Sequence, residues 1–416
     1  MPTTTMPTTI TGSRRADLFD GKKSSENEIS TFWIQEAMTM SERTNRGSGI
    51  PLQDNGYKPV DSGAQPVFEE VFSFENLMTS ARKCCRNVRW KASVQMFEIN
   101  QMEWVTKLHR QIHNGSYRSM GFREFWVKER GKERFIQSVH VSERCVQKCL
   151  TDFALKPIII PRLIYDNAAS LPGKGTEFAL KRFRKHLASH YRRYGDTGGV
   201  LVCDFKNYFG SIPHNKLLAL LKPVIHDERI FDISKYFIDQ FGDIGLGLGS
   251  EISQICAVFY PNILDHHIKE RLHIKGYGRY MDDFYLMHED VDYLRYCLSE
   301  IRRTIHDDLA LELNNKTQIA RNGIVFLKRR HHLSETGAVI SRLMRKNISG
   351  RRRTLRRQIA NGVDYNQSFI SWYGYANKWN SDRTVYEMKK EVLHGQGTRK
   401  GIGNNSQHDS GCRSQG

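Results

Sequence analysis

The sequence predicts an α+β protein, and three stretches carry that prediction. Residues 122–140, FREFWVKERGKERFIQSVH, contain two strand-like runs joined through Arg130, Gly131 and Lys132, which is a β-hairpin signal. Residues 176–195 place apolar side chains at helical spacing. Residues 198–205, GGVLVCDF, form a short apolar run that predicts a buried strand. A hairpin, a helix and a buried strand in one chain indicate a mixed fold.

The helix predicted before this strand has two different faces. Ala179, Phe183, Leu187 and Tyr191 share one apolar stripe, and Gly195 ends the pattern. Most cationic side chains fall elsewhere on the helix: Lys181, Arg182, Arg184, Lys185, Arg192 and Arg193. The pattern therefore predicts one face in the core and one cationic face.

Two further helix starts are predicted from local signals. Ser211 and Pro213 are expected to open a helix through HNKLLALL, because Ser caps helices well and Pro suits a first turn. Ser253 and Gln254 are expected to open the next one. Pro261 should kink or restart that helix, since proline cannot donate its backbone hydrogen bond.

The charge of the chain points to a polyanionic partner. Among 416 residues, Lys and Arg outnumber Asp and Glu by 63 to 45, a formal charge of +18. Nucleic acid is the leading partner class and an anionic membrane surface the second. No apolar run approaches the roughly 20 residues that span a bilayer, so no membrane insertion is expected, and the sequence predicts a cytoplasmic protein.

Cysteine and histidine spacing does not favour a zinc site. The 8 cysteines form no pair of C-x-x-C knuckles, which predicts reduced structural thiols. The pairs at residues 266–267 and 331–332 have no Cys or carboxylate at ligand spacing, so these histidines are expected at the surface or in a groove.

Three carboxylates are candidates for a metal site. Asp282 and Asp283 lie side by side in GYGRYMDDFYLMHED, where an apolar ribbon turns, and Asp204 ends the predicted buried strand. A soluble loop is the simpler interpretation of the pair. If the strands are neighbours, however, Asp204 and Asp282 converge and can hold two Mg²⁺ ions about 4 Å apart for in-line phosphoryl displacement. Asp283 cannot point the same way along an extended strand and is given a supporting role.

The order of these segments resembles that of a reverse transcriptase. LVCDFKNYFGSIPH resembles the first catalytic motif of that family, GLGLGSEISQ its nucleotide-positioning loop and YMDD its second catalytic motif. GKERFIQ and LPGKGT match the fingers segments of bacterial members, and LELNNKTQI and IVFLKRR resemble segments that follow YMDD. The resemblance covers about residues 71–390. It implies a right-hand polymerase fold with fingers, a palm of antiparallel sheet with helices on one face, and a helical thumb.

The resemblance also implies a division of the chain. Residues 1–70 are rich in Thr, Ser, Gly, Asp and Asn and are expected to form a flexible arm. The aperiodic C-terminal end is expected to be a disordered tail. The implied segments are fingers at 71–199, interleaved with the palm; palm at 200–325; primer grip and thumb at 326–395; and tail at 396–416.

Further residues receive roles from the resemblance. Phe209 matches the ring under the incoming sugar, with a core Phe as the alternative, and Lys316 matches a proton donor to pyrophosphate, with a surface lysine as the alternative. Leu248, Gly249 and Gln254 fall in the nucleotide-positioning segment. Lys132 and Arg134 resemble the triphosphate clamp of the fingers, with solvated charges as the alternative.

The predicted thumb is basic. Residues 342–357 contain eight Lys or Arg and no acid, which suits a helix that follows a phosphate backbone. The candidate nucleic-acid contacts are Arg351, Arg352, Arg353, Arg356 and Arg357. The aromatics of FISWYGYANKW are expected to pack in the thumb core. Lys328 and Arg329 depart from the Gly-Tyr that often completes the primer-grip turn, which puts the geometry of that turn in question.

The group within the family stays open between two alternatives. The aliphatic Leu248 followed by Ser-Gln resembles the enzymes of diversity-generating retroelements, although Gly247 stands where that group often has Pro. Phage-defence reverse transcriptases share the same core, and a catalytically inactive RNA-binding scaffold is a distant third. Either enzyme implies a bacterial or phage-encoded protein using Mg²⁺, with Mn²⁺ as a substitute. Its partners are an RNA template, a DNA or RNA primer, dNTPs, and a small basic accessory protein or a structured noncoding RNA.

Overall fold

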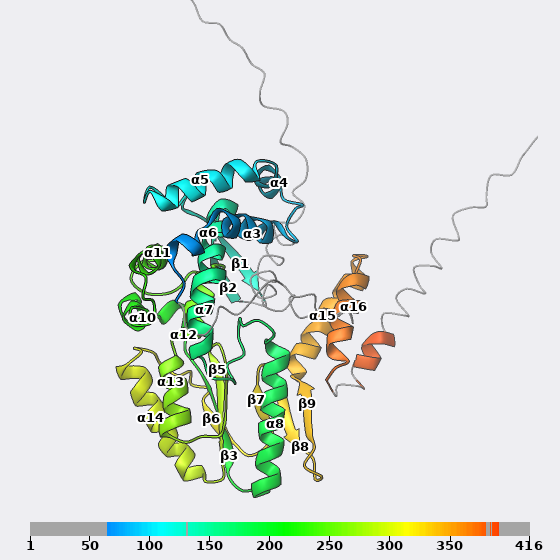
Figure 1. Ribbon diagram of the computed structural model, residues 1–416. Helices are drawn as coiled ribbons and strands as arrows, with labels where there is room; N and C mark the ends of the chain where they lie inside the picture. The colour runs from blue at the N-terminus through cyan, green and yellow to red at the C-terminus, as the bar shows by residue number, and fades with distance from the viewer. Residues whose placement is uncertain (1–64, 130–131, 380–382, 384, 391–416) are drawn as a thin grey trace, which may run out of the picture.

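The computed structural model describes residues 65–129, 132–379, 383 and 385–390 (Figure 1). Residues 1–64 of the arm predicted at 1–70 lie outside the described residues. The whole tail predicted at 396–416 also lies outside them. The described strands form antiparallel sheets of two, four and three strands beside many helices. The α+β prediction is therefore confirmed.

A four-stranded antiparallel sheet lies at the centre, in the order β4-β5-β3-β6. Its first predicted strand is confirmed, because the run from Gly199 to Cys203 is buried. Burial of successive residues on both faces explains the continuous apolar sequence. The strands are β3 (Gly199–Asp204), β4 (Gly276–Tyr280), β5 (Asp283–His288) and β6 (Gln318–Ala320).

Helices cover both faces of this sheet, not the single face that the sequence led us to expect. Leu201 and Cys203 of β3 pack in one core with α14 (Val291–Asp307), whereas Val200 and Val202 pack in another with α8 (Thr176–Tyr194). The two helices flank the sheet in Figure 1. The expectation of one covered face was wrong because both sets of alternating side chains on β3 are apolar. The apolar stripe and glycine stop of α8 are as predicted, with Gly195 at φ 58°.

Helices dominate the N-terminal part of the described chain. A long helix runs through α6, a π-helical turn, α7 and a 3₁₀ turn, and α3, α4 and α5 pack against its first part. The elements are α2 (Phe68–Val71), α3 (Phe74–Cys85), α4 (Ala92–Ile99), α5 (Gln101–His113), α6 (Val141–Leu150), the π-helical turn (Thr151–Leu155), α7 (Lys156–Ile159) and the 3₁₀ turn (Ile160–Arg162). The seven described cysteines are free and buried, in agreement with the prediction.

The predicted β-hairpin is present. Strands β1 (Phe122–Glu129) and β2 (Lys132–Val139) pair antiparallel along their whole length. The turn residues 130–131 lie outside the described residues.

Several short helices connect the hairpin region with the central sheet, and the structure corrects two of the predicted starts. Ser211 ends α9 and does not cap α10, which begins at His214 after Pro213. Ser250, not Ser253, caps α12, because its Oγ accepts from a backbone N–H of the first turn. The predicted restart after Pro261 is confirmed. The helices are α9 (Tyr208–Ser211), α10 (His214–Leu221), α11 (Glu228–Asp239), α12 (Glu251–Phe259), α13 (Asn262–His266) and a π-helical turn (His267–Arg271).

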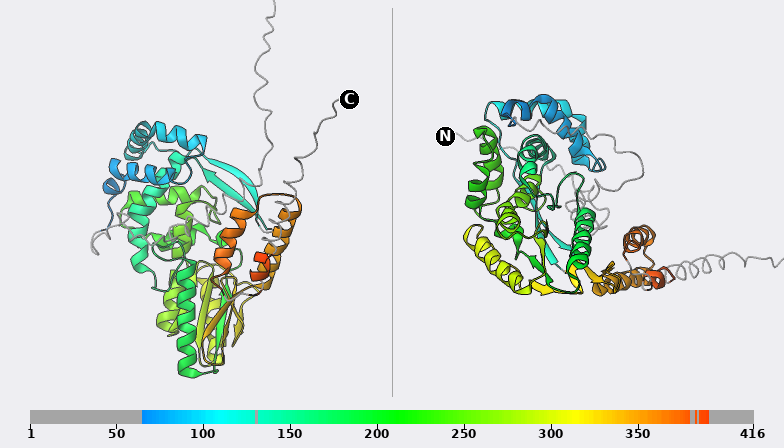
Figure 2. Two further views of the ribbon diagram at one scale, coloured as in Figure 1. Left: turned by 90° about the vertical axis from the view of Figure 1, so that its right-hand side faces the viewer. Right: turned by 60° about the horizontal axis from the view of Figure 1, so that its bottom comes forward.

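The C-terminal part consists of a three-stranded sheet followed by two helices. Figure 2 shows α15 and α16 standing beside the main body. His331 is fully buried against Phe183 with ring centroids 4.6 Å apart, so its predicted position at the surface or in a groove was wrong. The elements are β7 (Ile324–Phe326), β8 (Arg329–Leu333), β9 (Val339–Leu343), α15 (Arg345–Ala360) and α16 (Asn366–Ala376). Among the described residues, no helix combines the length and the apolar character needed to cross a membrane.

Candidate active site

Three carboxylates meet at one edge of the central sheet. Strands β3 and β5 are neighbours, and Asp204 at the end of β3 pairs in register with Asp283 at the start of β5. Tyr280 pairs with Asp283 across the β4–β5 hairpin, so Met281 and Asp282 form its two-residue turn. The charge of Asp204 acts on both Asp282 and Asp283, so the three carboxyl groups lie close to one another. The structure therefore brings together the two carboxylates that the sequence paired, with Asp283 beside them.

The turn that carries Asp282 has an unusual backbone. Met281 adopts φ 56°, a left-handed conformation that costs a non-glycine residue on the order of 1 kcal/mol. Neighbouring main chain holds the turn, because the Phe205 N–H donates to the Asp282 carbonyl oxygen at 3.3 Å. The Asn314 N–H likewise donates to the Asp204 carbonyl oxygen at 2.7 Å. These bonds fix the backbone of both carboxylates to one scaffold.

Burial and mutual repulsion disfavour the ionised forms of these carboxyl groups when no cation is bound. Burial, followed by the nearby charge of Asp204, raises the pKa of Asp282 to about 6. Burial, followed by the charges of Asp282 and Asp204, raises the pKa of Asp283 to about 8. Lys328 acts against both shifts and Lys316 against the second. Such a cluster favours a bound cation, because a cation stabilises the ionised forms.

The donor set fits Mg²⁺ of the kind that a substrate brings with it. Among the described residues, no group of three or more His, Cys, Asp or Glu is arranged as a complete metal cage. Mg²⁺ in nucleotide-dependent enzymes is typically held by one or two carboxylates plus phosphate oxygens and water. Asp204 and Asp282 supply that number, and their hard oxygen atoms suit the ion.

Lys316 and Lys328 place positive charge near the carboxylates from two separate turns. Lys316 is exposed in the turn before β6, where its N–H donates to Asn314 Oδ1 at 3.2 Å. Lys328 is exposed in the two-residue turn between β7 and β8. Leu327 and Lys328 both have positive φ, 47° and 61°. Lys328, which stands where the resemblance leads us to expect glycine, therefore occupies a conformation that favours glycine. No sequence pattern assigned a role to Lys328.

Phe209 lies where the loop of residues 245–254 meets the segment that follows Asp204. It is half-buried in α9, and its ring packs edge-on against Tyr208 with centroids 5.8 Å apart. The Leu246 N–H donates to the Phe209 carbonyl oxygen at 2.7 Å. The structure thus docks the loop onto α9, while the contact of Phe209 with a sugar stays a prediction.

Leu248 connects the positioning loop to the β1–β2 hairpin. It is half-buried and packs against Val127 and Ile136. Gly247 is needed here because the ring of Phe241 occupies the place of a Cβ atom. Gly249 follows with φ 106°, which other residues rarely adopt. The glycines therefore serve the path of the loop, and Leu248 anchors it.

The remaining nucleotide-binding candidates lie on surrounding elements. Gln254, in α12, accepts a hydrogen bond from Ser170 Oγ at 3.4 Å. Lys132 begins β2, and the half-buried Arg134 pairs in register with Val127. Their contacts with a nucleotide stay predictions.

The predicted thumb arginines do not share one environment. Arg353, Arg356 and Arg357 are exposed on α15. Arg351 is half-buried and donates from Nη2 to Ser368 Oγ on α16 at 2.7 Å, and Arg352 is also half-buried. Arg351 therefore joins the two helices. The aromatics largely pack as predicted, with the partly buried rings lying against the core of α15 and α16: Trp372, Tyr373 and Trp379.

Arg329 is a second residue to which sequence reasoning assigned no function. It is buried at the start of β8, and its guanidinium lies 4.2 Å from the Trp379 ring centroid and 5.2 Å from that of Tyr375. Its Nη2 also donates to the Tyr375 hydroxyl at 2.5 Å. Arg329 therefore connects the β7–β8 hairpin to the C-terminal helices.

Comparisons with known proteins leave the family of the chain open. No family model and no curated protein matches it. One solved structure that matches is a telomerase from Candida albicans in complex with a TWJ fragment of telomeric RNA. The match has 12% sequence identity and a TM-score of 0.40, and it covers 61% of this chain and 50% of that chain. The site is therefore interpreted from its own residues.

Proposed function

We propose that this chain is an RNA-directed DNA polymerase that makes cDNA by nucleotidyl transfer with two Mg²⁺ ions. The supporting observation is that Asp204, at the end of β3, and Asp282, in the β4–β5 turn, converge at one edge of the central sheet. The surrounding motifs resemble those of reverse transcriptases, which supports nucleotidyl transfer as the reaction at this carboxylate pair. An RNA template, a primer and dNTPs are the substrates of that reaction.

The carboxylates of the site would bind metal ions, and the nearby lysines would contact the phosphates of the substrate. Asp204 and Asp282 would hold the metal ions, and Asp283 would add to the negative field beside them. Bound Mg²⁺ lowers the pKa of an attacking hydroxyl and stabilises the charge of a leaving pyrophosphate. Lys316, whose charge acts on Asp283, would give a proton to the leaving pyrophosphate. Lys328, in the turn between β7 and β8, would offer a positive charge to a phosphate of the substrate.

The loop and the hairpin would form the pocket for the incoming nucleotide. Phe209 and the loop that docks on it would set the position of the sugar. Leu248 packs against the hairpin strands that carry Lys132 and Arg134. This contact would couple the loop to the strands that approach the triphosphate. The apolar contact of Leu248 supports the proposal of error-prone copying, because packing alone discriminates weakly between similar shapes.

Primer extension on an RNA template tests the activity. With Mg²⁺ and dNTPs the wild-type protein should extend the primer, and Asp204→Asn or Asp282→Asn should lower the rate by about 10³-fold or more. Asp283→Asn should cause a smaller loss. Asp307→Asn makes the same chemical change at an exposed residue of α14 and is the matched control. Undiminished extension by the Asp282 variant would overturn the assignment. Mn²⁺ should also support extension.

The biological system is proposed to be a diversity-generating retroelement of a bacterium or phage. The aliphatic Leu248 supports this choice over phage defence, since errors are useful only where sequence diversity is the product. Sequencing cDNA from cells that carry the native locus, including any accessory protein, would separate the two. Misincorporation concentrated at template adenines supports the retroelement, and accurate copying there supports defence.

A further inference from the structure

The outward face of α8 carries a cationic cluster that the proposed catalytic site does not use. Lys181, Arg184 and Lys185 are exposed at helical spacings of three and four residues, so they are neighbours on one face. The sequence predicted a cationic face for this helix. The structure places it opposite the apolar stripe that packs on the central sheet.

This cluster has no balancing acid within the part of the chain that the structure describes. No carboxylate lies within ion-pair distance of Lys181, Arg184 or Lys185 there, whereas their neighbour Arg182 pairs with Asp166 at 2.5 Å. Like charges three and four residues apart destabilise a helix by a few tenths of a kcal/mol. Arg182 is thus neutralised by Asp166, whereas Lys181, Arg184 and Lys185 are available to bind an anion.

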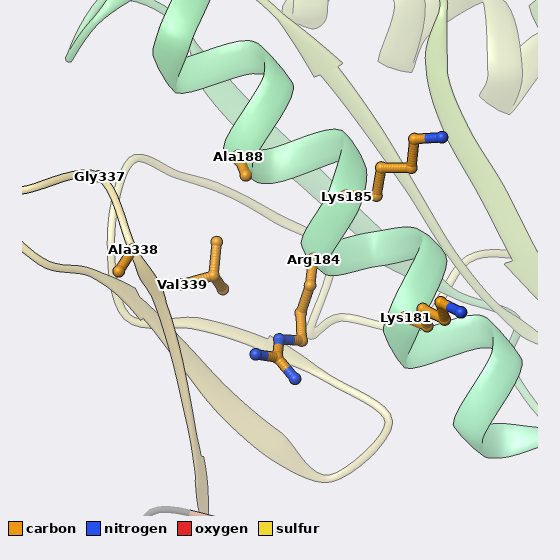
Figure 3. A pocket seen from close by; sticks show the side chains of 7 residues that line it. All are labelled: Lys181, Arg184, Lys185, Ala188, Gly337, Ala338 and Val339. Atoms are coloured by element: carbon orange, nitrogen blue, oxygen red, sulfur yellow. The ribbon is translucent and has the colours of Figure 1, made fainter.

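The cluster borders a hollow between α8 and the turn that leads into β9. A cavity of about 280 Å³ is lined by the cationic residues, Ala188 and the turn. In Figure 3, Arg184 extends into the space beside Val339, while Lys181 and Lys185 extend from the other side of the same helix, away from that space. The full lining is Lys181, Arg184, Lys185, Ala188, Gly337, Ala338 and Val339, without an acid.

The close approach of the turn to α8 depends on Gly337. This residue has φ 75°, and a Cβ added there would lie 2.6 Å from the ring of Tyr191. Ser334 and Ala338 close the turn, since the Ser334 N–H donates to the Ala338 carbonyl oxygen at 2.9 Å. The wall of the hollow is therefore an ordered hairpin turn seated against the helix.

The position of α8 connects this surface to the catalytic edge. Thr176, at the start of α8, donates from Oγ1 to the Tyr280 hydroxyl at 3.2 Å, directly before the catalytic turn. Lys181 and Lys185 follow at about 7.5 and about 13.5 Å along the helix axis, from a rise of about 1.5 Å per residue. The cationic face thus begins near the catalytic edge and runs away from it.

We propose that this cationic hollow binds the phosphodiester backbone of RNA that lies outside the primer–template duplex. The proposal rests on the proposed function, in which an RNA is the template. The Arg184 guanidinium suits a bidentate contact with a phosphate, and the lysines add point charges along the strand. A basic accessory protein is disfavoured at this surface, because like charges would meet there.

Binding to two RNA probes tests the proposal with the full-length protein. One probe is a short RNA–DNA hybrid without an extension, and the other is the same hybrid with an RNA hairpin extending from the template strand. The test variant is Lys181→Gln/Arg184→Gln/Lys185→Gln. The control, Lys222→Gln/Lys235→Gln/Lys275→Gln, removes the same charge at three exposed lysines elsewhere. Circular dichroism should show that both variants are folded.

The test variant should bind the extended probe about tenfold more weakly, and this loss of affinity should be at least five times that for the short hybrid. The slope of log affinity against log salt for the extended probe should fall by about 2, at about 0.7 to 0.9 for each phosphate that the protein no longer neutralises. The control should bind like wild type. Equal losses on both probes, no loss, or tighter binding of a matching DNA hairpin would overturn the proposal. Primer extension is measured separately, so inactive wild-type protein would contradict the polymerase and not this binding result.

Discussion

Arg279 and Asp265 form a fully buried ion pair behind the turn that carries Asp282. The guanidinium Nη2 lies 2.6 Å from Asp265 Oδ2, and both side chains have 0% exposure. Arg279 Nη1 also donates to the carbonyl oxygen of Met281 at 3.1 Å. The pair therefore holds the strained residue next to Asp282 from inside the protein.

Breaking this pair should affect stability and rate in separable ways. Asp265→Ala leaves a buried guanidinium without its carboxylate and should lower the free energy of unfolding by about 3 to 5 kcal/mol. Asp265→Leu/Arg279→Met removes both charges and should recover most of that loss, measured by urea denaturation. The double variant should extend primers more slowly than wild type even though its stability is recovered, because it lacks the hydrogen bond from Arg279 to the Met281 carbonyl oxygen. Wild-type rates in a stable double variant would show that Arg279 does not position the turn.

A second charge cluster predicts acid sensitivity. Asp152, in the π-helical turn after α6, lies 2.6 Å from Lys156, 2.9 Å from Lys83 and 3.5 Å from Lys148. Burial alone would raise the pKa of Asp152, but Lys156 and Lys148 outweigh it and hold the pKa well below its usual range. A carboxyl with a lowered pKa stabilises the fold above its unfolded pKa, about 3.9, and loses that contribution as the pH falls.

Asp152→Asn should therefore lower the free energy of unfolding by about 2 to 3 kcal/mol at pH 7. The difference from wild type should shrink as the pH falls below about 4, because the carboxyl takes up a proton in the unfolded chain while it stays ionised in the folded protein. Urea denaturation across that range measures the difference. Exposed Asp292→Asn is the control and should show little difference at any pH. A constant difference would mean that Asp152 acts through packing alone.

Two exposed arginines of α15 should contribute to nucleic-acid affinity through charge. Arg353→Gln/Arg357→Gln should weaken binding of a primer–template and lower the salt slope by about 1 to 2, because phosphates that no longer meet an arginine retain their counterions. Arg351→Gln is the comparison, since Arg351 bonds to Ser368 and should mainly affect stability. Filter binding over a range of salt concentrations measures the slope, and an unchanged slope would contradict a role for α15 in binding the phosphate backbone.

Local patterns predicted the strands that lead to Asp204 and Asp283 better than they predicted what packs against those strands. Asp204 follows a run of apolar residues, and the β-period sets its place at the end of a strand, so its meeting with Asp282 depends only on strand pairing. The sequence of β3 also indicates that both faces of the sheet are covered, because Val200 and Val202 on one face are as apolar as Leu201 and Cys203 on the other.

Long-range partners were less accessible from the sequence. Arg279 lies in an apolar strand, a rare position for arginine, which indicates a buried counter-charge without identifying Asp265. His331 became buried because the β8 strand turns it toward Phe183, a residue far away in the chain. The difference between Arg351 and Arg353 depends on how α15 packs on α16. Such contacts arise from tertiary packing, and charge or periodicity within one segment does not specify them.

Leu248 offers a test in which side-chain chemistry and packing can be separated. It packs with Val127 and Ile136 between the positioning loop and the β1–β2 hairpin. Glutamine at this position has a similar length but carries a carboxamide. A carboxamide buried among these side chains without a partner would cost about 1 to 3 kcal/mol, so glutamine is favoured only where it reaches a polar partner, such as a bound nucleotide.

Leu248→Gln should therefore lower the misincorporation rate, because a polar contact with the nucleotide distinguishes substrates that apolar packing, worth about 1 to 3 kcal/mol, does not. Leu248→Met keeps an apolar side chain of similar volume and should copy with wild-type errors. The measurement is to copy one RNA with the three proteins, together with any native accessory protein, and to sequence the products. If both variants change fidelity alike, the packing of the loop on the hairpin controls selection. If neither does, Leu248 has no part in it.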